Sequence, residues 1–140
     1  MVIMAVDLGD ARTGIAVSDS GESFAFPKGV IYERKKERLI EKLVNAAKEN
    51  SAELIVVGLP KNMDGSEGFR AQECTQTAEL LAAATNLPVK MWDERCTTVL
   101  AHNTLNYTNT RGQKRKQTVD AVAATLILES FLAARKNNKD

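Results

Sequence analysis

The sequence of 140 residues predicts an α/β fold, in which a mixed five-stranded sheet has helices on both faces. Three observations lead to this prediction. The chain opens with two short apolar runs around a glycine-bearing turn, which is typical of a hairpin. Later apolar runs are separated by amphipathic helical segments, as in parallel strands joined by crossovers. The run ELIVVGL at 53–59 is almost continuously apolar, which favours a central strand buried on both faces.

Three strands are expected in the first quarter of the chain, at residues 1–7, 14–18 and 24–32. The opening run MVIMAVD ends in a carboxylate, and GIAVS follows after a turn that contains Gly9. In the third segment, Pro27 and Gly29 indicate an edge strand or an irregularity. The hairpin and this third strand form the antiparallel part of the predicted sheet.

Helices and strands alternate over the rest of the chain. Amphipathic periodicity predicts helices at 33–50, 66–86, 97–105 and 117–136, and apolar runs predict strands at 53–59 and 88–93. Ser66 is expected to cap the second helix. The side chains expected to face the core are Leu39, Ile40, Leu43, Val44 and Ala47 in the first helix, Leu80, Leu81 and Ala84 in the second, and Val119, Val122, Ala123, Leu126 and Ile127 in the last. The predicted order is β-β-β-α-β-α-β-α-α, and sheets of this kind bind ligands at the carboxyl ends of their strands.

The composition is that of one globular domain spanning residues 1–140. Hydrophobic residues make up 44% of the chain and charged residues 26%, and the net charge is +1. No segment approaches the roughly 20 apolar residues of a membrane span, so we expect a cytoplasmic protein with no membrane partner. Cys74 and Cys96 form no Cys-x-x-Cys pair, which argues against a zinc or redox site. With His102 as the only histidine, a Ser-His or Cys-His nucleophile is hard to assemble.

Three acidic residues stand at the ends of predicted elements. Asp7 ends the first strand, Glu94 follows the last strand, and Asp120 lies in the first turn of the closing helix. If both strands present their carboxyl ends at one edge, these side chains share a rim. Each also has a plainer explanation: Asp7 could form a turn, Glu94 could pair with Arg95, and Asp120 could complement the helix dipole.

Mg²⁺ is the cofactor expected if the three carboxylates converge, and Mn²⁺ could replace it. Mg²⁺ prefers oxygen ligands and keeps several waters. Two such ions, about 3.5–4 Å apart, stabilise the attacking and leaving oxygens when water hydrolyses a phosphodiester. We expect Asp7 to bridge the ions, with Glu94 and Asp120 completing the site.

A cationic loop is expected at 106–116, just ahead of Asp120. Its cluster suits contacts with a phosphate backbone, although a solvated surface would have the same composition. The segment LPKNMDGSEGFR at 59–70 offers a second phosphate site at the start of a helix. The clustered cations are Arg111, Lys114, Arg115 and Lys116.

Four motifs, which together cover nearly the whole chain, resemble those of the YqgF family of pre-16S rRNA nucleases and Holliday junction resolvase-like proteins. They occur in the family's order and spacing. The motifs are DLGDARTGIAVSD at Asp7–Asp19, GLPKNMDGSEGFRAQ at Gly58–Gln72, WDERCTT at Trp92–Thr98 and KRKQTVDAVAA at Lys114–Ala124.

The resemblance implies a ribonuclease H-like fold, with Asp7, Glu94 and Asp120 as the acidic metal-binding and catalytic set. The same motifs carry four polar positions that we expect to contact substrate or to orient the carboxylates, beside the cluster at Lys114, Arg115 and Lys116. These four are Arg12, Asn62, Arg70 and Arg95.

We therefore expect a Mg²⁺-dependent endonuclease that acts on structured nucleic acid, with an rRNA precursor as substrate. Resolution of branched DNA is the alternative within the same chemistry, and it would favour a symmetric dimer. The sequence leaves the choice between monomer and homodimer open. Two rivals from other classes are a non-catalytic nucleic-acid-binding module and an actin-like or sugar-kinase-like ATP-binding domain. The ATP-binding domain would need a second phosphate loop, for which the chain has no room.

Overall fold

The computed structural model describes residues 1–60, 68–94 and 112–137, and for 112–121 it describes only the backbone. It contains a five-stranded sheet in the order β3-β2-β1-β4-β5. The first three strands pair antiparallel, whereas β4 pairs parallel with both β1 and β5. The predicted mixed sheet is therefore confirmed. The strands are β1 (Ile3–Asp7), β2 (Arg12–Ser18), β3 (Ala25–Tyr32), β4 (Leu54–Leu59) and β5 (Val89–Asp93).

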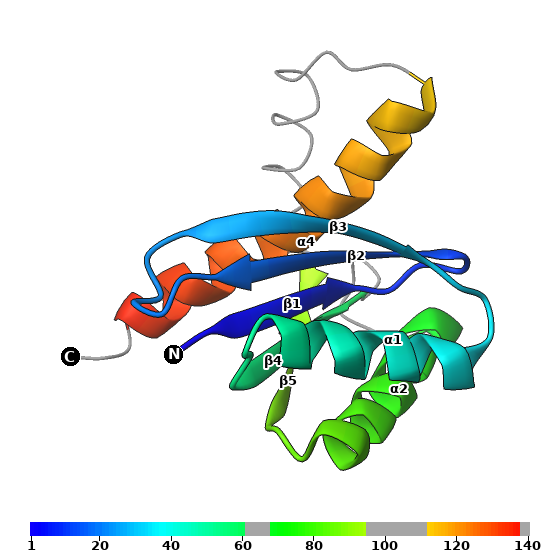
Figure 1. Ribbon diagram of the computed structural model, residues 1–140, viewed down its shortest axis with the longest axis horizontal. Coiled ribbons are helices and arrows are strands. Elements are labelled where there is room, and N and C mark those ends of the chain that lie inside the picture. Colours follow the sequence, from blue (N-terminus) through cyan, green and yellow to red (C-terminus); the bar gives the residue numbers. More distant parts are fainter. Residues whose placement is uncertain (61–67, 95–111, 138–140) are drawn as a thin grey trace.

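Helices cover both faces of the sheet, as predicted (Figure 1). The helices α1 (Lys36–Glu49) and α2 (Phe69–Thr85) pack on one face, and α4 (Gly112–Asn137) crosses the other. Both α1 and α4 begin at the end of the molecule toward which β1 runs (Figure 1). This end therefore combines the carboxyl end of β1 with the first turns of two helices.

The side chains of β1 alternate between two hydrophobic cores, one on each face. Met4 and Val6 belong to the core under α1 and α2, whereas Ile3 and Ala5 belong to the core under α4. All four are fully buried, which requires apolar side chains on both faces of the strand. By this alternation, Asp7 continues the series that faces α4.

The edge strand β3 contains the irregularity expected near Pro27 and Gly29. Ile15 pairs with Gly29 and the next residue, Ala16, pairs with Pro27, so Lys28 is an extra residue in the ladder. Gly29 has a φ of 120°, which side chains rarely adopt. The bulge bends β3. Because β3 is an edge strand, it tolerates a proline, which has no N–H group to donate to the ladder.

Two expectations for α2 were wrong. The helix begins at Phe69 with Gly68 at its N-cap, so Ser66 lies too early to cap it. Leu80 is 49% exposed and Ala84 is also exposed, whereas Leu81 is buried as predicted. The buried stripe of the helix consists of Ala71, Cys74, Thr77, Ala78 and Leu81.

The closing helix begins earlier than predicted, at Gly112 instead of residue 117. The Lys114–Lys116 stretch is therefore helical and not a loop, in keeping with the good helix propensity of Gln, Lys and Arg. Leu126 and Ile127 are buried as predicted. The side chain of Val119 is outside the described part, and Val122 and Ala123 are only partly buried. Buried side chains that the prediction missed are Ala124, Leu128, Phe131 and Leu132.

The predicted helix at 97–105 lies outside the described residues. Among the helices that are described, none is both long and apolar enough to cross a membrane.

Candidate functional site

A cleft of about 540 Å³ opens beyond the carboxyl end of β1. Two of the three predicted acidic residues, Asp7 and Glu94, lie in its wall. Polar and charged groups predominate in the lining, so the cleft suits a charged ligand. The residues that line it are Asp7, Leu8, Gly9, Asp10, Ala11, Arg12, Arg34, Arg70 and Glu94.

Asp7 is held by the sheet and followed by a tight turn. It pairs with Gly14 of β2 at the last position of the β1 ladder. A Cβ atom at Gly9 would collide with the backbone oxygen of Arg12, so only glycine fits this turn. The turn therefore brings Arg12 back beside Asp7 in the same cleft.

Glu94 reaches the cleft across Gly58 of the neighbouring strand β4. A Cβ atom at Gly58 would lie 3.0 Å from the Cγ and 3.1 Å from the Cδ of Glu94. The side chain of Glu94 therefore occupies the space that a side chain at position 58 would fill. Because β4 lies between β1 and β5, this path directs the Glu94 carboxylate toward the strand that ends in Asp7.

Packing against α4 holds the end of β5, two residues before Glu94. The indole of Trp92 donates a hydrogen bond to the Ser130 Oγ at 3.1 Å. Its ring also meets Phe131 edge to face, with 5.5 Å between the centroids. These contacts fix the position from which Glu94 extends.

Asp120 lies on α4, on the face of the sheet to which Asp7 also points. It stands one turn before the buried Ala124 and two turns before Ile127, whose Cδ1 contacts the Gly58 position. The expectation that Asp120 lies in the first helical turn was wrong, because the helix begins eight residues earlier, at Gly112. The helix dipole therefore does not explain this residue. The side chain of Asp120 lies outside the described part.

The pKa of the Cys74 thiol is affected by both acidic residues of the cleft. Burial raises the pKa of Cys74 to about 11, and the negative charges of Glu94 and Asp7 contribute in the same direction. Arg70 opposes them by lowering the pKa. Cys74 is a buried free thiol, whereas Cys96 lies outside the described residues.

Arg70, at the start of α2, holds the β1–β2 turn in place. Its Nη1 donates to the Asp10 Oδ1 at 2.7 Å, and its Nη2 donates to the carbonyl oxygen of Leu8 at 3.0 Å. The hydrogen bond to Asp10 is the main reason why the pKa of Arg70 is raised. Because Leu8 directly follows Asp7, Arg70 fixes the backbone beside this carboxylate.

Of the other predicted site residues, Arg12 lines the cleft. Asn62 and Arg95 lie outside the described residues, and the side chains of Lys114, Arg115 and Lys116 are likewise not described. Sequence reasoning missed Arg34, which lines the cleft from the segment after β3. The signal for it was the cationic run RKK at 34–36.

Comparisons with known proteins agree with one another. The family model described as "RuvX: Holliday junction resolvase" matches residues 1–134. A protein of Clostridium novyi (strain NT), named "Putative pre-16S rRNA nuclease", is 39% identical over 132 residues, covering 94% of this chain and 98% of that protein. A protein of the same name from Pelotomaculum thermopropionicum is 42% identical over 133 residues, covering 94% of this chain and 86% of that protein.

Among solved structures, RuvC of T. thermophilus in complex with a Holliday junction substrate matches with a TM-score of 0.65. The match covers 99% of this chain and 97% of that chain, at 13% sequence identity. At this identity the likeness concerns the fold alone, and it confirms the predicted ribonuclease H-like fold.

Proposed function

We propose, since this chain belongs to the RuvX family, that it is a nuclease that hydrolyses phosphodiester bonds in the precursor of 16S ribosomal RNA. The observation that carries the proposal is the cleft, in which Asp7 and Glu94 stand together beyond the carboxyl end of β1. The names of the relatives support the substrate. Processing of ribosomal RNA agrees with the expected cytoplasmic location.

The residues present fit a hard divalent cation such as Mg²⁺. Asp7 and Glu94 offer carboxylate oxygens, and the described lining of the cleft includes no sulfur or imidazole ligand. Among the described side chains, no three acidic, His or Cys residues group closely enough to hold a metal ion. We assign the role of a third ligand to Asp120 on α4.

In this proposal, Asp7, Glu94 and Asp120 hold the metal, which supplies positive charge to the oxygens that attack and leave the phosphorus. The chain's own residues do the rest. Arg70 keeps the turn after Asp7 in one conformation, which preserves the position of the carboxylate. Arg12 and Arg34 line the same cleft and are suited to bind the substrate phosphate.

Resolution of branched DNA is the second candidate function, and the description of the family favours it. The chemistry at the phosphodiester would be the same. The two candidates differ in the sugar of the backbone, ribose or deoxyribose, and in how the arms of the substrate are held. A side-by-side assay of a labelled rRNA precursor and a four-way DNA junction, with Mg²⁺ and with EDTA, separates them.

The decisive variant is Asp7→Asn. We expect it to abolish cleavage, to leave metal-free stability equal or slightly higher, and to remove most of the Mg²⁺-induced rise in melting temperature. In the wild-type protein this rise corresponds to about 2.7 kcal/mol when Mg²⁺ is at ~100 times its dissociation constant. Thermal melts with and without Mg²⁺, run beside the cleavage assay, measure all three effects.

Glu79→Gln is the matched control, because it removes the same charge from an exposed position on α2. This control should keep both cleavage and the Mg²⁺ response. An Asp7→Asn protein that cleaves at nearly the wild-type rate would remove Asp7 from the site and the proposed mechanism with it.

A further inference from the structure

Four cations are concentrated where α1 begins. They are Arg34, Lys35, Lys36 and Arg38, here called the α1 patch, and all four are exposed. Within the part of the chain that the structure describes, none of the four takes part in a salt bridge. The neighbouring Glu33 pairs with Lys42, whose Nζ lies 3.0 Å from its Oε1, and Arg38 also helps to lower the pKa of Glu33.

The stability of α1 does not explain the α1 patch. The N-terminus of a helix carries partial positive charge, so cations in the first turn are unfavourable there. Lys35 occupies the N-cap and makes no capping hydrogen bond through its side chain. Glu37 is the one acidic residue in the first turn of this helix. The patch therefore opposes the local electrostatics of the helix, and an external anion is what would make the arrangement favourable.

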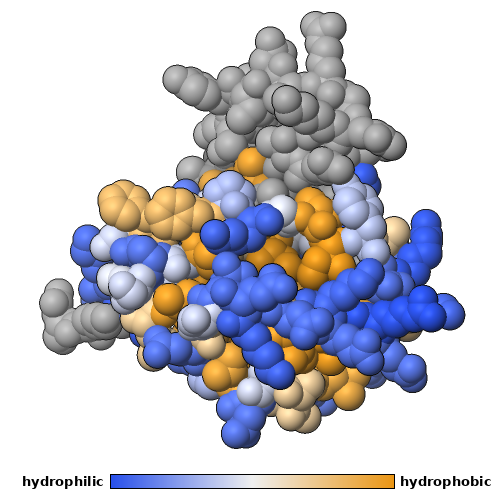
Figure 2. Space-filling model, in the orientation of Figure 1, coloured by the Kyte–Doolittle hydropathy of each residue, from blue (hydrophilic) through white to orange (hydrophobic). Residues whose placement is uncertain are grey.

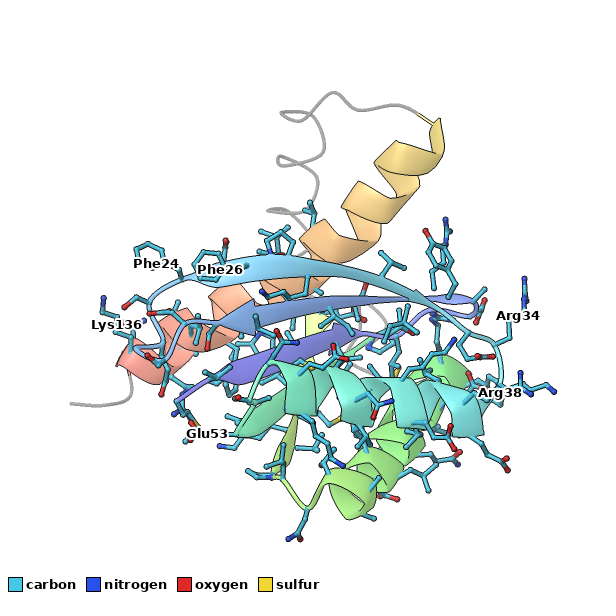
Figure 3. All side chains as sticks on the ribbon, in the orientation of Figure 1. Phe24, Phe26, Arg34, Arg38, Glu53 and Lys136 are labelled. Atoms are coloured by element: carbon cyan, nitrogen blue, oxygen red, sulfur yellow. The ribbon has the colours of Figure 1, made fainter. Side chains whose placement is uncertain are left out.

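The α1 patch is continuous with the cleft. Arg34 lines the cleft that contains Asp7 and Glu94, and Lys36 lines an adjoining cavity of about 160 Å³, which also contains Arg34. Arg34 and Arg38 extend outward at one end of the molecule (Figure 3). Hydrophilic residues form a broad area over α1 that reaches this same end (Figure 2).

We propose that the α1 patch binds the phosphate backbone of a helical arm of the substrate, next to the arm that is cut in the cleft. The inference rests on the proposed function, because it assumes that the cleft holds the scissile phosphate. Exposed cations on long side chains suit evenly spaced phosphates and carry no sequence selectivity. The start of α4 lies on the opposite face of the sheet at the same end of the molecule (Figure 1).

The test compares two triple variants by the salt dependence of duplex binding. The patch variant is Lys35→Gln, Lys36→Gln and Arg38→Gln, which leaves the cleft residue Arg34 intact. The control is Lys28→Gln, Lys48→Gln and Lys90→Gln, which removes the same charge from exposed positions elsewhere. Binding of labelled RNA and DNA duplexes is measured by fluorescence anisotropy in EDTA, so that nothing is cleaved, and circular dichroism checks that both variants fold.

We expect the salt slope of the patch variant to fall by about 0.9 for each lost phosphate contact, up to roughly 2.7. Raising salt from about 50 to 200 mM should then weaken duplex binding by the wild-type protein up to ~40 times more than binding by the patch variant. The control should keep the wild-type slope. The RNA and DNA duplexes distinguish the two sources of the helical arm.

An unchanged slope in the patch variant would overturn the inference, and this is the result expected if the patch served an acidic protein instead. Equal losses in both triple variants would also overturn it, since net charge alone would then explain the binding. Because binding is measured without cleavage, this test does not depend on nuclease activity. If the proposed nuclease function is wrong, the Asp7→Asn experiment shows it and this one does not.

Discussion

At position 58, glycine leaves room for the side chain on which the candidate site depends. A Cβ atom there would lie 2.7 Å from the Cδ1 of Ile127 and 3.0 Å from the Cγ of Glu94. We expect Gly58→Ala to destabilise the fold by about 1–3 kcal/mol through overpacking and to lower cleavage by moving Glu94. Denaturant unfolding and the cleavage rate measure these two effects.

Adding Ile127→Val to Gly58→Ala separates the two effects. The smaller side chain at 127 should relieve part of the overpacking and restore part of the stability. The displacement of Glu94 should persist, so the cleavage rate should remain low. A Gly58→Ala protein that cleaves as fast as the wild type would show that the position of Glu94 is unimportant.

Ionisation of Cys74 should lower the free energy of unfolding at alkaline pH. Its pKa is about 11 in the folded protein, against about 8.5 in an unfolded chain. Below pH 8.5 the thiol is protonated in both states, so folding is not penalised. As the pH rises toward 11, the unfolded chain loses this proton more readily than the folded protein, so the free energy of unfolding falls.

The measurement is a series of thermal melts of the wild type and Cys74→Ala between pH 7 and 11. We expect the wild type to lose stability relative to the variant as the pH rises through this window. Peptide mapping after alkylation at pH 8 should show little modification of Cys74 in the native protein. Parallel pH profiles for the two proteins would contradict this assignment.

At the scale of elements, the early start of α4 places three cations on a helix and not in a loop. Lys114, Arg115 and Lys116 lie in the first turns of this helix, which begins at the end of the molecule toward which β1 runs (Figure 1). Replacing all three with Ala should weaken substrate binding and reduce its salt slope by up to about 0.7–0.9 per lost phosphate contact. Substrate binding at several salt concentrations provides the measurement, and an unchanged slope would assign these residues to the solvated surface.

The sequence was most informative where periodicity and burial coincide. All five strands were predicted to within two residues at either end, because buried runs of apolar side chains mark them clearly. The start of α4 was misplaced because a cationic run without apolar residues resembles a loop. Leu80 of α2 was wrongly assigned to the core because it is apolar yet exposed. The sequence alone does not show which elements a helix packs against.

The candidate site was likewise predictable from the sequence only in part. Asp7 and Glu94 could be predicted to share a rim, since the carboxyl ends of parallel strands meet at one edge of a sheet. Two features depended on tertiary structure and were invisible in the sequence. One is the path of Glu94 across Gly58, and the other is the hydrogen bond of Arg70 to Leu8, 62 residues away.

At the scale of the whole molecule, the N-terminus and the last turns of α4 are linked at the end opposite the α1 patch (Figure 3). Arg135, near the end of α4, donates from Nε to the Glu22 Oε1 at 2.8 Å and from Nη2 to the Oε2 at 3.3 Å. The amino group of Met1 lies 3.2 Å from the same Oε2. The guanidinium also stacks 5.7 Å from the ring centre of Phe131. Glu22 therefore links the β2–β3 turn to the N-terminus and to the end of α4.

Stability and catalysis should consequently be separable by mutation. Arg135→Ala removes two charge-assisted hydrogen bonds and leaves Glu22 largely buried, so we expect a loss of about 1.5–3 kcal/mol in the free energy of unfolding. Arg135→Lys should recover only part of this loss, because an ammonium group cannot form the paired contact. Lys136→Ala, which changes an exposed neighbour at the same end, should have almost no effect (Figure 3). Urea unfolding measures these differences, and cleavage under conditions where all variants are folded should proceed at the wild-type rate. A fall in that rate without a loss of stability in Arg135→Ala would show that this end of the molecule takes part in the reaction.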